Sequence, residues 1–377
     1  MGGYTRLLVV LSMLAAVALT SKAQYVISIN KDEATKQFYT SFYIGDDGME
    51  TRVNLLLDLG TNLTWANCRR LESLSSLHLV RCQSPTCKAI PGNGCDSRNI
   101  CLYQQPNPLG KNSSVTGRVV QDTASFTASS FRPFTFSCAA VKTPQGLPPP
   151  VAGILGLSTG EYSFWRQVTK KFNIIPQFTL CLPSSGTTGN FYIGGISYSV
   201  PRTPTSMRVS SGEYFFVVNS IYVDGTPLSL NPGLLNGGAK LSTVVPYTVL
   251  HTDIYNALAQ SFTLKAKAMG ISQVRSVAPF KNCFDARAAA GNNIPVIEIG
   301  VPGKIREERW TFHGTNTVVN INKKVICLAF IDAGKKPKEN IVVGTYQLQN
   351  YIVTFDMSRT ELTFSDSLLL HNTSCSS

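Results

Sequence analysis

The stretch VNLLLDLGTNLTWANC, from Val53 to Cys68, decides the fold that this chain is expected to adopt. A short apolar run delivers one carboxylate, Asp58, at the end of a strand. Gly60 stands two residues later and permits a tight turn that a side chain would hinder. Leu63 and Trp65 then resume an alternating apolar pattern, which indicates a second strand. The stretch therefore predicts a carboxylate held in a turn between two strands.

Composition and charge exclude several classes of function. The chain has 377 residues, of which 43% are apolar and 15% charged, and this favours about two domains with real cores. Abundant Gly, Ser, Thr and Val favour β structure. The net charge of +12 is spread widely, which indicates a solubilising surface with weak attraction to acidic wall polymers or acidic proteins. Aromatic residues are not interleaved with basic clusters, so nucleic-acid binding is not expected.

Residues 1–23 have the pattern of a secretory signal. Arg6 is the charged start, residues 7–20 form an apolar core, and Ser21 to Ala23 supply small residues before a cut. A membrane helix needs about 20 apolar residues, so cleavage is expected rather than anchoring. The sequence thus predicts a secreted, extracellular protein with no membrane partner.

Secretion makes the cysteines a disulfide framework rather than a metal or redox set. Sequence leaves the connectivity open, and we expect three bridges among the first six cysteines, with Cys181–Cys375 and Cys283–Cys327 beyond them. No His stands at ligand spacing near a cysteine, so neither a metal nor another cofactor is expected. The ten residues are Cys68, Cys82, Cys87, Cys95, Cys101, Cys138, Cys181, Cys283, Cys327 and Cys375.

Two further patterns indicate local structure. Residues 156–160 fit the G-x-S-x-G pattern of a hydrolase nucleophile. However, Ser158 precedes Glu161 by three residues, which is typical of a capping box at a helix start. None of the four His stands in a sequence pattern that suggests a partner for Ser158 in a catalytic triad. Residues 248–267 are predicted to form one helix, because Ile254, Leu258 and Phe262 recur at a spacing of four.

Together, several segments resemble the pepsin-like aspartic proteases. They are the Asp58 stretch, residues 151–157, residues 178–195, and residues 341–365, which carry the most specific match. The resemblance covers essentially all of residues 25–366. It implies an all-β fold class, mostly β with a few short helices, as a bilobal body with a central cleft. The N-terminal lobe would span residues 24–200, including a Cys-rich insert, and the C-terminal lobe residues 201–377.

A pepsin-like protease needs a second Asp that shares one proton with the first, so that one carboxyl acts as base and the other as acid. Counting back from the helix, Ser242 falls where that Asp should be, and Val244 replaces the turn Gly. Leu59 replaces a hydroxyl residue, the flap position lacks its Tyr, and the first strand leaves no room for a pro-segment. We therefore expect no catalytic residues, with Asp58 as a structural residue that bonds nearby amides.

Among pepsin-like proteins that lack the second Asp, the chain resembles the TAXI-type inhibitors of microbial family 11 xylanases, which act in plant defence. That group places a His four residues before its last Cys in the xylanase cleft, which implies His371 here. An imidazolium between two carboxyls about 5 Å apart would form charge-assisted hydrogen bonds to both. A second contact loop of that group supplies a Leu to a sugar subsite of the xylanase. The corresponding residues here, 288–295, form a shorter loop, in which only Ile294 could take the place of that Leu. A merely polar, exposed tail is the alternative reading of His371.

Two sequons bear on this surface. Asn112 lies in a polar loop, whereas Asn372 is adjacent to His371, where a glycan would hinder insertion. The expected partner is a xylanase or related glycoside hydrolase, bound by a monomer. Three hypotheses remain open: a xylanase inhibitor, a basic seven-S-like globulin or inhibitor of another glycosidase such as a xyloglucan-specific endoglucanase, and an active aspartic endopeptidase.

Overall fold

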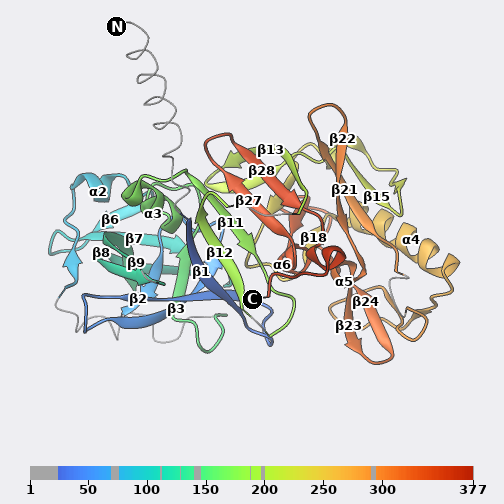
Figure 1. Cartoon of the computed structure of the whole chain (residues 1–377), viewed down its shortest axis with the longest axis horizontal. Coiled ribbons are helices and arrows are strands. Elements are labelled where there is room, and N and C mark those ends of the chain that lie inside the picture. Colours follow the sequence, from blue (N-terminus) through green and yellow to red (C-terminus); the bar gives the residue numbers. More distant parts are fainter. Residues whose placement is uncertain are drawn as a thin grey trace, which may run out of the picture.

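The fold is seen in a computed structural model (Figure 1), which describes residues 24–68, 76–110, 113–127, 129–139, 146–186, 188–196, 200–289 and 294–376. Strands dominate these residues, with a few short helices, as the sequence predicts. The first half of the chain packs on the left of Figure 1 and the second half on the right, with shared strands between them. The described residues contain no helix that is long and apolar enough to cross a membrane.

The elements of the first half run from β1 to β12. They are β1 Gln24–Lys31, β2 Phe38–Ile44, β3 Thr51–Asp58, β4 Trp65–Asn67, β5 His78–Leu79, α2 Pro85–Lys88, β6 Asn93–Cys95, β7 Cys101–Pro106, β8 Ser114–Phe126, β9 Ser129–Ala139, β10 Gly153–Gly156, α3 Phe164–Phe172, β11 Gln177–Cys181 and β12 Gly189–Gly194.

The elements of the second half run from β13 to the C-terminal turn. They are β13 Arg202–Ser210, β14 Glu213–Phe216, β15 Ser220–Val223, β16 Thr226–Pro227, η2 Pro232–Leu234, β17 Ala239–Leu241, β18 Thr248–Leu250, α4 Thr252–Ala268, β19 Gln273–Val274, β20 Cys283–Asp285, β21 Ile297–Pro302, β22 Glu307–Phe312, α5 Gly314–Thr317, β23 Val318–Asn322, β24 Val325–Leu328, β25 Phe330–Asp332, β26 Ile341–Val343, α6 Thr345–Leu348, β27 Ile352–Asp356, β28 Glu361–Ser365 and η3 Leu368–His371.

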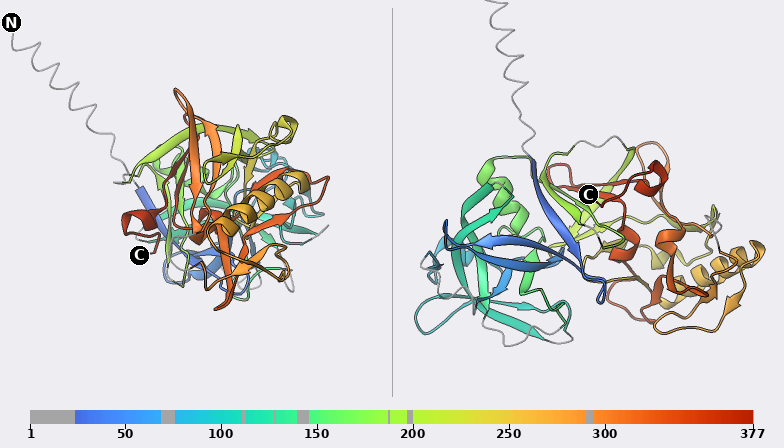
Figure 2. Two further views of the ribbon diagram at one scale, coloured as in Figure 1. Left: turned by 90° about the vertical axis from the view of Figure 1, so that its right-hand side faces the viewer. Right: turned by 60° about the horizontal axis from the view of Figure 1, so that its bottom comes forward.

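One antiparallel sheet joins the two halves. Its strands follow the order β1, β12, β11, β27, β28 and β13, so strands from both ends of the sequence are neighbours. Figure 2 shows these strands between the two packed bodies. Phe178 of β11 stacks on Phe355 of β27 with ring centroids 4.5 Å apart, and Tyr214 meets Phe355 edge-on. Because these buried rings come from both halves, the sheet and its core hold the halves as one body.

Five disulfides lie in the described part of the chain. The first six cysteines form Cys68–Cys138, Cys82–Cys95 and Cys87–Cys101, and the last four form Cys181–Cys375 and Cys283–Cys327. This division into three and two is the one expected from the sequence. Cys181–Cys375 closes a loop with a sequence separation of 194, so it ties the C-terminal tail to the shared sheet.

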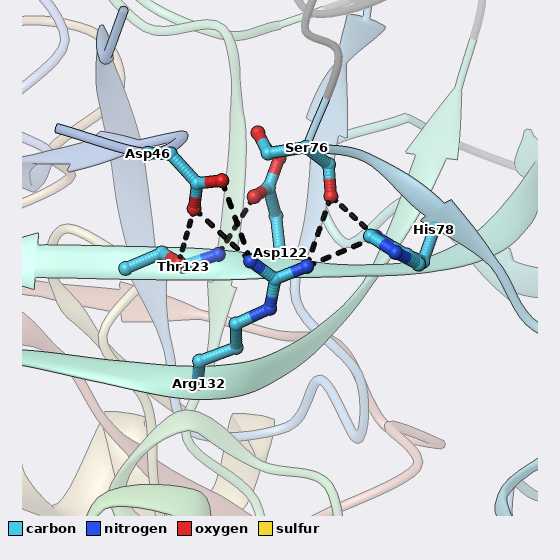
Figure 3. Close-up of polar contacts among 6 residues, drawn as sticks. All are labelled: Asp46, Ser76, His78, Asp122, Thr123 and Arg132. Carbon is cyan, nitrogen blue, oxygen red and sulfur yellow. Dashed lines mark hydrogen bonds and ion pairs between the residues drawn. The ribbon is translucent and has the colours of Figure 1, made fainter. Parts of the chain in front are cut away.

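The first part of the Cys-rich insert, which the sequence places at residues 69–101, is attached to its lobe at Ser76 by a polar network (Figure 3). Arg132 of β9 pairs with Asp46 at 3.1 Å and donates to the backbone oxygen of Ser76 at 3.5 Å. The Ser76 hydroxyl donates to buried Asp122, which also accepts from the backbone of Thr123. The network therefore connects the β2–β3 turn, the insert and the β8–β9 pair.

One local prediction was wrong at its boundary and another was wrong altogether. The helix over residues 248–267 is confirmed from residue 252 onward, and only its start was wrong. The helix expected over residues 248–267 begins at Thr252, because residues 248–250 form β18 between β25 and β26. The capping box also fails, since α3 begins at Phe164. The Ser158 hydroxyl instead donates to Asn62 Oδ1 at 2.6 Å and accepts from the Gly160 amide at 3.0 Å. In both cases long-range pairing overrides a local pattern.

Candidate functional site

The Asp58 loop, residues 58–64, begins where β3 ends. Asp58 is only 5% exposed. Its Oδ1 accepts from the Gly60 amide at 2.9 Å, and its Oδ2 accepts from the Thr61 hydroxyl at 2.6 Å. Burial raises the pKa of this carboxyl, and the Thr61 and Gly60 hydrogen bonds oppose that rise. Asp58 thus accepts hydrogen bonds from an amide and a hydroxyl of its own loop.

The Ser242 loop, residues 242–248, begins where β17 ends in the second half. Ser242 is 4% exposed, and its amide donates to the Val343 oxygen at 3.0 Å. Its hydroxyl oxygen accepts from the amides of Val244 at 3.3 Å and Val245 at 3.2 Å. Ser242 therefore organises the turn that follows it, as Asp58 does in the first half.

The two loops repeat the same long-range contacts. The Gly156 amide donates to Thr64 Oγ1 at 3.1 Å, and the Gly344 amide donates to Thr248 Oγ1 at 3.1 Å. Thr64 and Thr248 each stand six residues after the first residue of their loop. A strand runs parallel to each leading strand: β10 beside β3, and β26 beside β17. The lobes thus build the same local frame, with a carboxylate in one and a hydroxyl in the other.

A hydrogen bond crosses between the two loops. The Leu59 amide donates to the Thr243 hydroxyl at 3.1 Å, and Thr243 is fully buried. Leu59 has no hydroxyl, so it cannot provide the reciprocal bond to the Ser242 loop. The connection between the two loops is therefore one-sided, as the residue at position 59 predicts.

One carboxylate of the second half approaches the Asp58 loop, and sequence reasoning missed it. Glu213 begins β14, and its Oε1 lies 3.3 Å from where a Cβ on Gly60 would stand; Asp58 Oδ1 lies 3.5 Å from the same point. Lys240 of β17 donates to Glu213 Oε1, and Lys338 Nζ lies 3.8 Å from Oε2. Among described residues, no hydrogen bond joins Asp58 to a carboxylate. Glu213 is thus engaged by two cations.

The loops line a cleft of about 500 Å³ between the halves. Asp58, Ser242, Glu213 and Lys240 contribute polar groups to its wall. Tyr103 of β7 also lines it, and burial raises the pKa of this phenol to about 12, with the nearby Asp58 charge adding to the rise. Because its phenol stays protonated at ordinary pH, Tyr103 adds no charge to the cleft.

The C-terminal tail forms a second candidate surface. The turn η3 holds Leu368 in the core, but leaves Leu369 39% and Leu370 53% exposed. His371 and Asn372 are also exposed, and Asn372 adopts a left-handed backbone with φ of 54°. Exposed leucines beside an imidazole form an apolar and polar patch of the kind found at protein interfaces.

Ile294 packs in a different segment, against Gly314. A Cβ at Gly314 would lie 3.2 Å from Ile294 Cβ, so no larger residue fits without a shift. His313 adjoins this contact; burial lowers its pKa, while the charge of Asp366, just before the tail turn, raises it. Asn112 lies outside the described residues.

No cluster of three or more His, Cys, Asp or Glu side chains suited to a metal ion occurs in the part of the chain that the structure describes. The chain has the architecture of a pepsin-like protein. Its two lobes have matching loop frames, share one antiparallel sheet and enclose a cleft.

Comparisons with known proteins give the family. The model "Xylanase inhibitor N-terminal" matches residues 38–195, and "Xylanase inhibitor C-terminal" matches residues 213–366. A Nicotiana benthamiana protein named "Probable aspartic proteinase GIP2" is 30% identical, over 93% of this chain and 90% of that protein. The chain therefore belongs to the xylanase-inhibitor family of pepsin-like proteins.

Solved structures agree with this membership. The crystal structure of edgp matches with a TM-score of 0.87 and 28% identity, covering 94% of this chain and 97% of that chain. Basic 7S globulin from soybean matches with a TM-score of 0.81 and 25% identity, covering 94% and 98%. The bilobal, mostly β fold class expected from the sequence is thereby confirmed.

Proposed function

We propose that this chain is a non-catalytic pepsin-like protein in which Ser242 stands in place of a second catalytic Asp. The repeated loop frame supports the correspondence, because Thr64 and Thr248 hold equivalent amides at equal distances. A Ser hydroxyl at this place cannot share a proton with Asp58 in the way a carboxyl would. Glu213 does not replace it, since Lys240 and Lys338 engage its carboxylate.

The function proposed for this scaffold is inhibition of a microbial endo-1,4-β-xylanase of glycoside hydrolase family 11. One observation carries it: the turn η3 exposes Leu369, Leu370 and His371, while the Cys181–Cys375 bridge fixes the tail behind them. A tail that presents apolar surface but cannot unravel loses little conformational entropy on binding. The descriptions of both matching family models point in the same direction.

The proposed mechanism is charge-assisted blocking of the xylanase active site. A retaining glycosidase holds two carboxyls about 5 Å apart, and the His371 imidazolium would donate to both. Leu370 and Ile294 would cover adjacent apolar surface. Inhibition should therefore be strongest at acidic pH and should weaken as pH rises and the imidazolium loses its proton.

The test is a titration of family 11 and family 12 glycoside hydrolases with the wild-type chain and two tail variants. His371→Ala should weaken inhibition by at least about tenfold, because each charge-assisted hydrogen bond contributes about 1.5–3 kcal/mol. Leu370→Ser should weaken it as well, whereas its control Leu264→Ser should not, because Leu264 is an exposed leucine on α4. If His371→Ala inhibits as strongly as wild type, His371 is not the residue that contacts the xylanase carboxyls.

Asn372 determines whether the tail is accessible in a glycosylating host. We propose it as a glycan site beside the binding surface, together with Asn112. Asn372→Gln should leave inhibition unchanged in unglycosylated protein and strengthen it in glycosylated protein. A loss of inhibition in unglycosylated Asn372→Gln would instead assign the Asn side chain to the interface.

We further propose that residues 1–23 are removed on secretion to the apoplast, and that lobes 24–200 and 201–377 form a monomer without a cofactor. N-terminal sequencing of the secreted chain and sedimentation analysis would test these statements. A first residue other than Gln24, or a stable dimer, would contradict them.

Two alternatives have specific support. The soybean basic 7S globulin likeness favours a globulin-type protein or an inhibitor of another glycosidase, such as a xyloglucan-specific endoglucanase. The name of the Nicotiana relative favours an aspartic endopeptidase. Family 12 inhibition without family 11 inhibition would select the first. Pepstatin-sensitive cleavage of denatured haemoglobin at pH 3–5 would select the second.

A further inference from the structure

A groove on the far side of the shared sheet, distinct from the cleft and the tail, carries unpaired positive charge. It consists of two hollows of about 530 and 620 Å³ that share Arg202, Pro204 and Lys304, so they form one continuous depression. One wall is β13 with β27 and β28, and the other is the tip of the β21–β22 hairpin.

The hairpin tip is held firmly beside β13. The Gly303 amide closes the turn by donating to the Arg306 oxygen at 3.1 Å, and Thr205 Oγ1 donates to the Pro302 oxygen at 3.0 Å. The orange β21–β22 hairpin projects from the body in Figures 1 and 2. At its tip Ile305 is 98% exposed between Lys304 and Arg306, so the wall of the groove is preformed and open to solvent.

Three cations in the groove have no acidic partner. Arg202, Lys304 and Arg306 are exposed, and none forms an ion pair with any acid in the described part of the chain. By contrast, Arg359 at the groove floor lies 3.8 Å from Asp356 Oδ2. The three unpaired cations therefore retain their charge for an external anion.

The rest of the lining shows what kind of anion fits. Thr354 and Thr363 line the same groove as the cations, and so do three acids, Asp356, Glu361 and Glu308. Pro204 and Ile305 add apolar surface. Carboxylate and hydroxyl oxygens accept hydrogen bonds from sugar hydroxyls, and apolar atoms pack against sugar rings. A densely charged polymer without hydroxyls would be repelled by Glu361, whereas a sugar chain with spaced carboxylates suits both donors and acceptors.

We propose that this groove binds an acidic polysaccharide, a polymer of hexuronic acid, independently of any glycosidase. Arg202, Lys304 and Arg306 contact successive carboxylates, while Glu361 and the threonines contact ring hydroxyls. This would hold the chain on an acidic polymer matrix. No residue of 368–372 lines the groove, so the exposed side chains of the tail would remain available to a protein partner.

The probe is polygalacturonate on cross-linked beads, with the full chain added at low ionic strength and then at increasing salt. Wild-type protein should bind, and binding should weaken with salt because exposed charges are screened within about 10 Å at 0.1 M. The fully methyl-esterified polymer is the matched ligand, since it keeps the hydroxyls and loses the charge. Equal binding of the ester would overturn the proposal.

The variant Arg202→Gln/Lys304→Gln/Arg306→Gln should weaken binding by at least about tenfold. Its control, Lys267→Gln/Lys323→Gln/Lys324→Gln, removes the same charge from exposed positions on other elements. If both triples weaken binding equally, attraction follows net charge and the groove assignment is wrong.

A third ligand separates sugar recognition from acidic protein recognition. Polyaspartate carries the carboxylates without sugar hydroxyls, and it should bind more weakly than polygalacturonate and respond equally to the two triples. Tight polyaspartate binding that only the groove triple abolishes would assign the surface to an acidic protein and overturn the polysaccharide proposal. Glu361→Gln should weaken polygalacturonate binding less than the groove triple does.

Discussion

The Asp58 loop and the Ser242 loop share a frame but differ in every group that a protease would use. In each loop the first residue, Asp58 or Ser242, accepts backbone amides of its own turn. In each, a glycine amide also donates to a threonine hydroxyl at 3.1 Å. Yet one carries a carboxyl whose pKa is raised by burial, and the other carries a hydroxyl. The two loops therefore share a backbone frame, but only the Asp58 loop carries an ionisable group at its first residue.

The largest expected effects come from the paired glycines that sustain both frames. A Cβ at Gly344 would lie 2.6 Å from the Tyr247 carbonyl carbon, and one at Gly156 would lie 2.7 Å from the Thr61 oxygen. Because backbone atoms must move in each case, Gly344→Ala and Gly156→Ala should each lower the free energy of unfolding by about 3 kcal/mol. Urea unfolding measures this through the transition midpoint.

A control glycine sharpens that measurement. Gly237 has nothing within 4 Å of its would-be Cβ, so Gly237→Ala should change stability by well under 1 kcal/mol. If Gly156→Ala destabilises and Gly344→Ala behaves like Gly237→Ala, the two loops do not share one frame, and the correspondence of Ser242 with Asp58 fails.

The second prediction restores a carboxyl to the Ser242 loop. Ser242→Asp would bury an acid that faces the Val244 and Val245 amides, near the buried Asp58. Because desolvation and a like charge raise the pKa of such an acid, the variant should be less stable than wild type by about 2 kcal/mol at pH 7 and recover toward pH 4. Unfolding midpoints at several pH values measure it.

Ser242→Asn is the matched control, because it has the shape of Asp without the charge. Its stability relative to wild type should not vary between pH 4 and pH 7. If Ser242→Asp loses no more stability at pH 7 than at pH 4, the new carboxyl is solvated, and the loop is more open than the structure shows.

The third prediction concerns the hydrogen bond between Leu59 and Thr243, which joins the two loops. Thr243→Val keeps the shape but removes the acceptor of the Leu59 amide, leaving a buried donor unpaired. The expected loss is about 1 kcal/mol in the free energy of unfolding. Leu59→Thr in the Thr243→Val background should not recover it, since the missing acceptor lies on the other loop. Recovery would show that hydroxyls at 59 and 243 are interchangeable.

Local patterns predicted the frame well but missed the groups that cross it. Asp58 at a strand end was predicted from apolar spacing and a turn glycine, which act locally, and the segment 341–365 was identified by its resemblance to pepsin-like proteins. Lys240 and Glu213 meet only through the β14–β17 pairing, in which Phe215 opposes Lys240. No spacing along the sequence encodes that register. Ser158 failed as a cap for a similar reason, because Asn62, 96 residues away, takes its hydroxyl.

The smallest expected effect is a change in pH dependence at Asp58. Because burial raises its folded-state pKa above the unfolded value of about 3.8, the protonated form favours folding. Its contribution is fully present below that unfolded value and is lost as pH rises through the folded-state pKa. Asp58→Asn removes this titration, so the variant should gain stability relative to wild type across that window.

Asp96→Asn is the opposite control, since hydrogen bonds from the Ile100 and Arg98 amides hold the pKa of Asp96 low. An Asp58→Asn curve parallel to wild type from pH 3 to pH 7 would mean that the carboxyl is neutralised by another group, with Lys240 the cation to examine first.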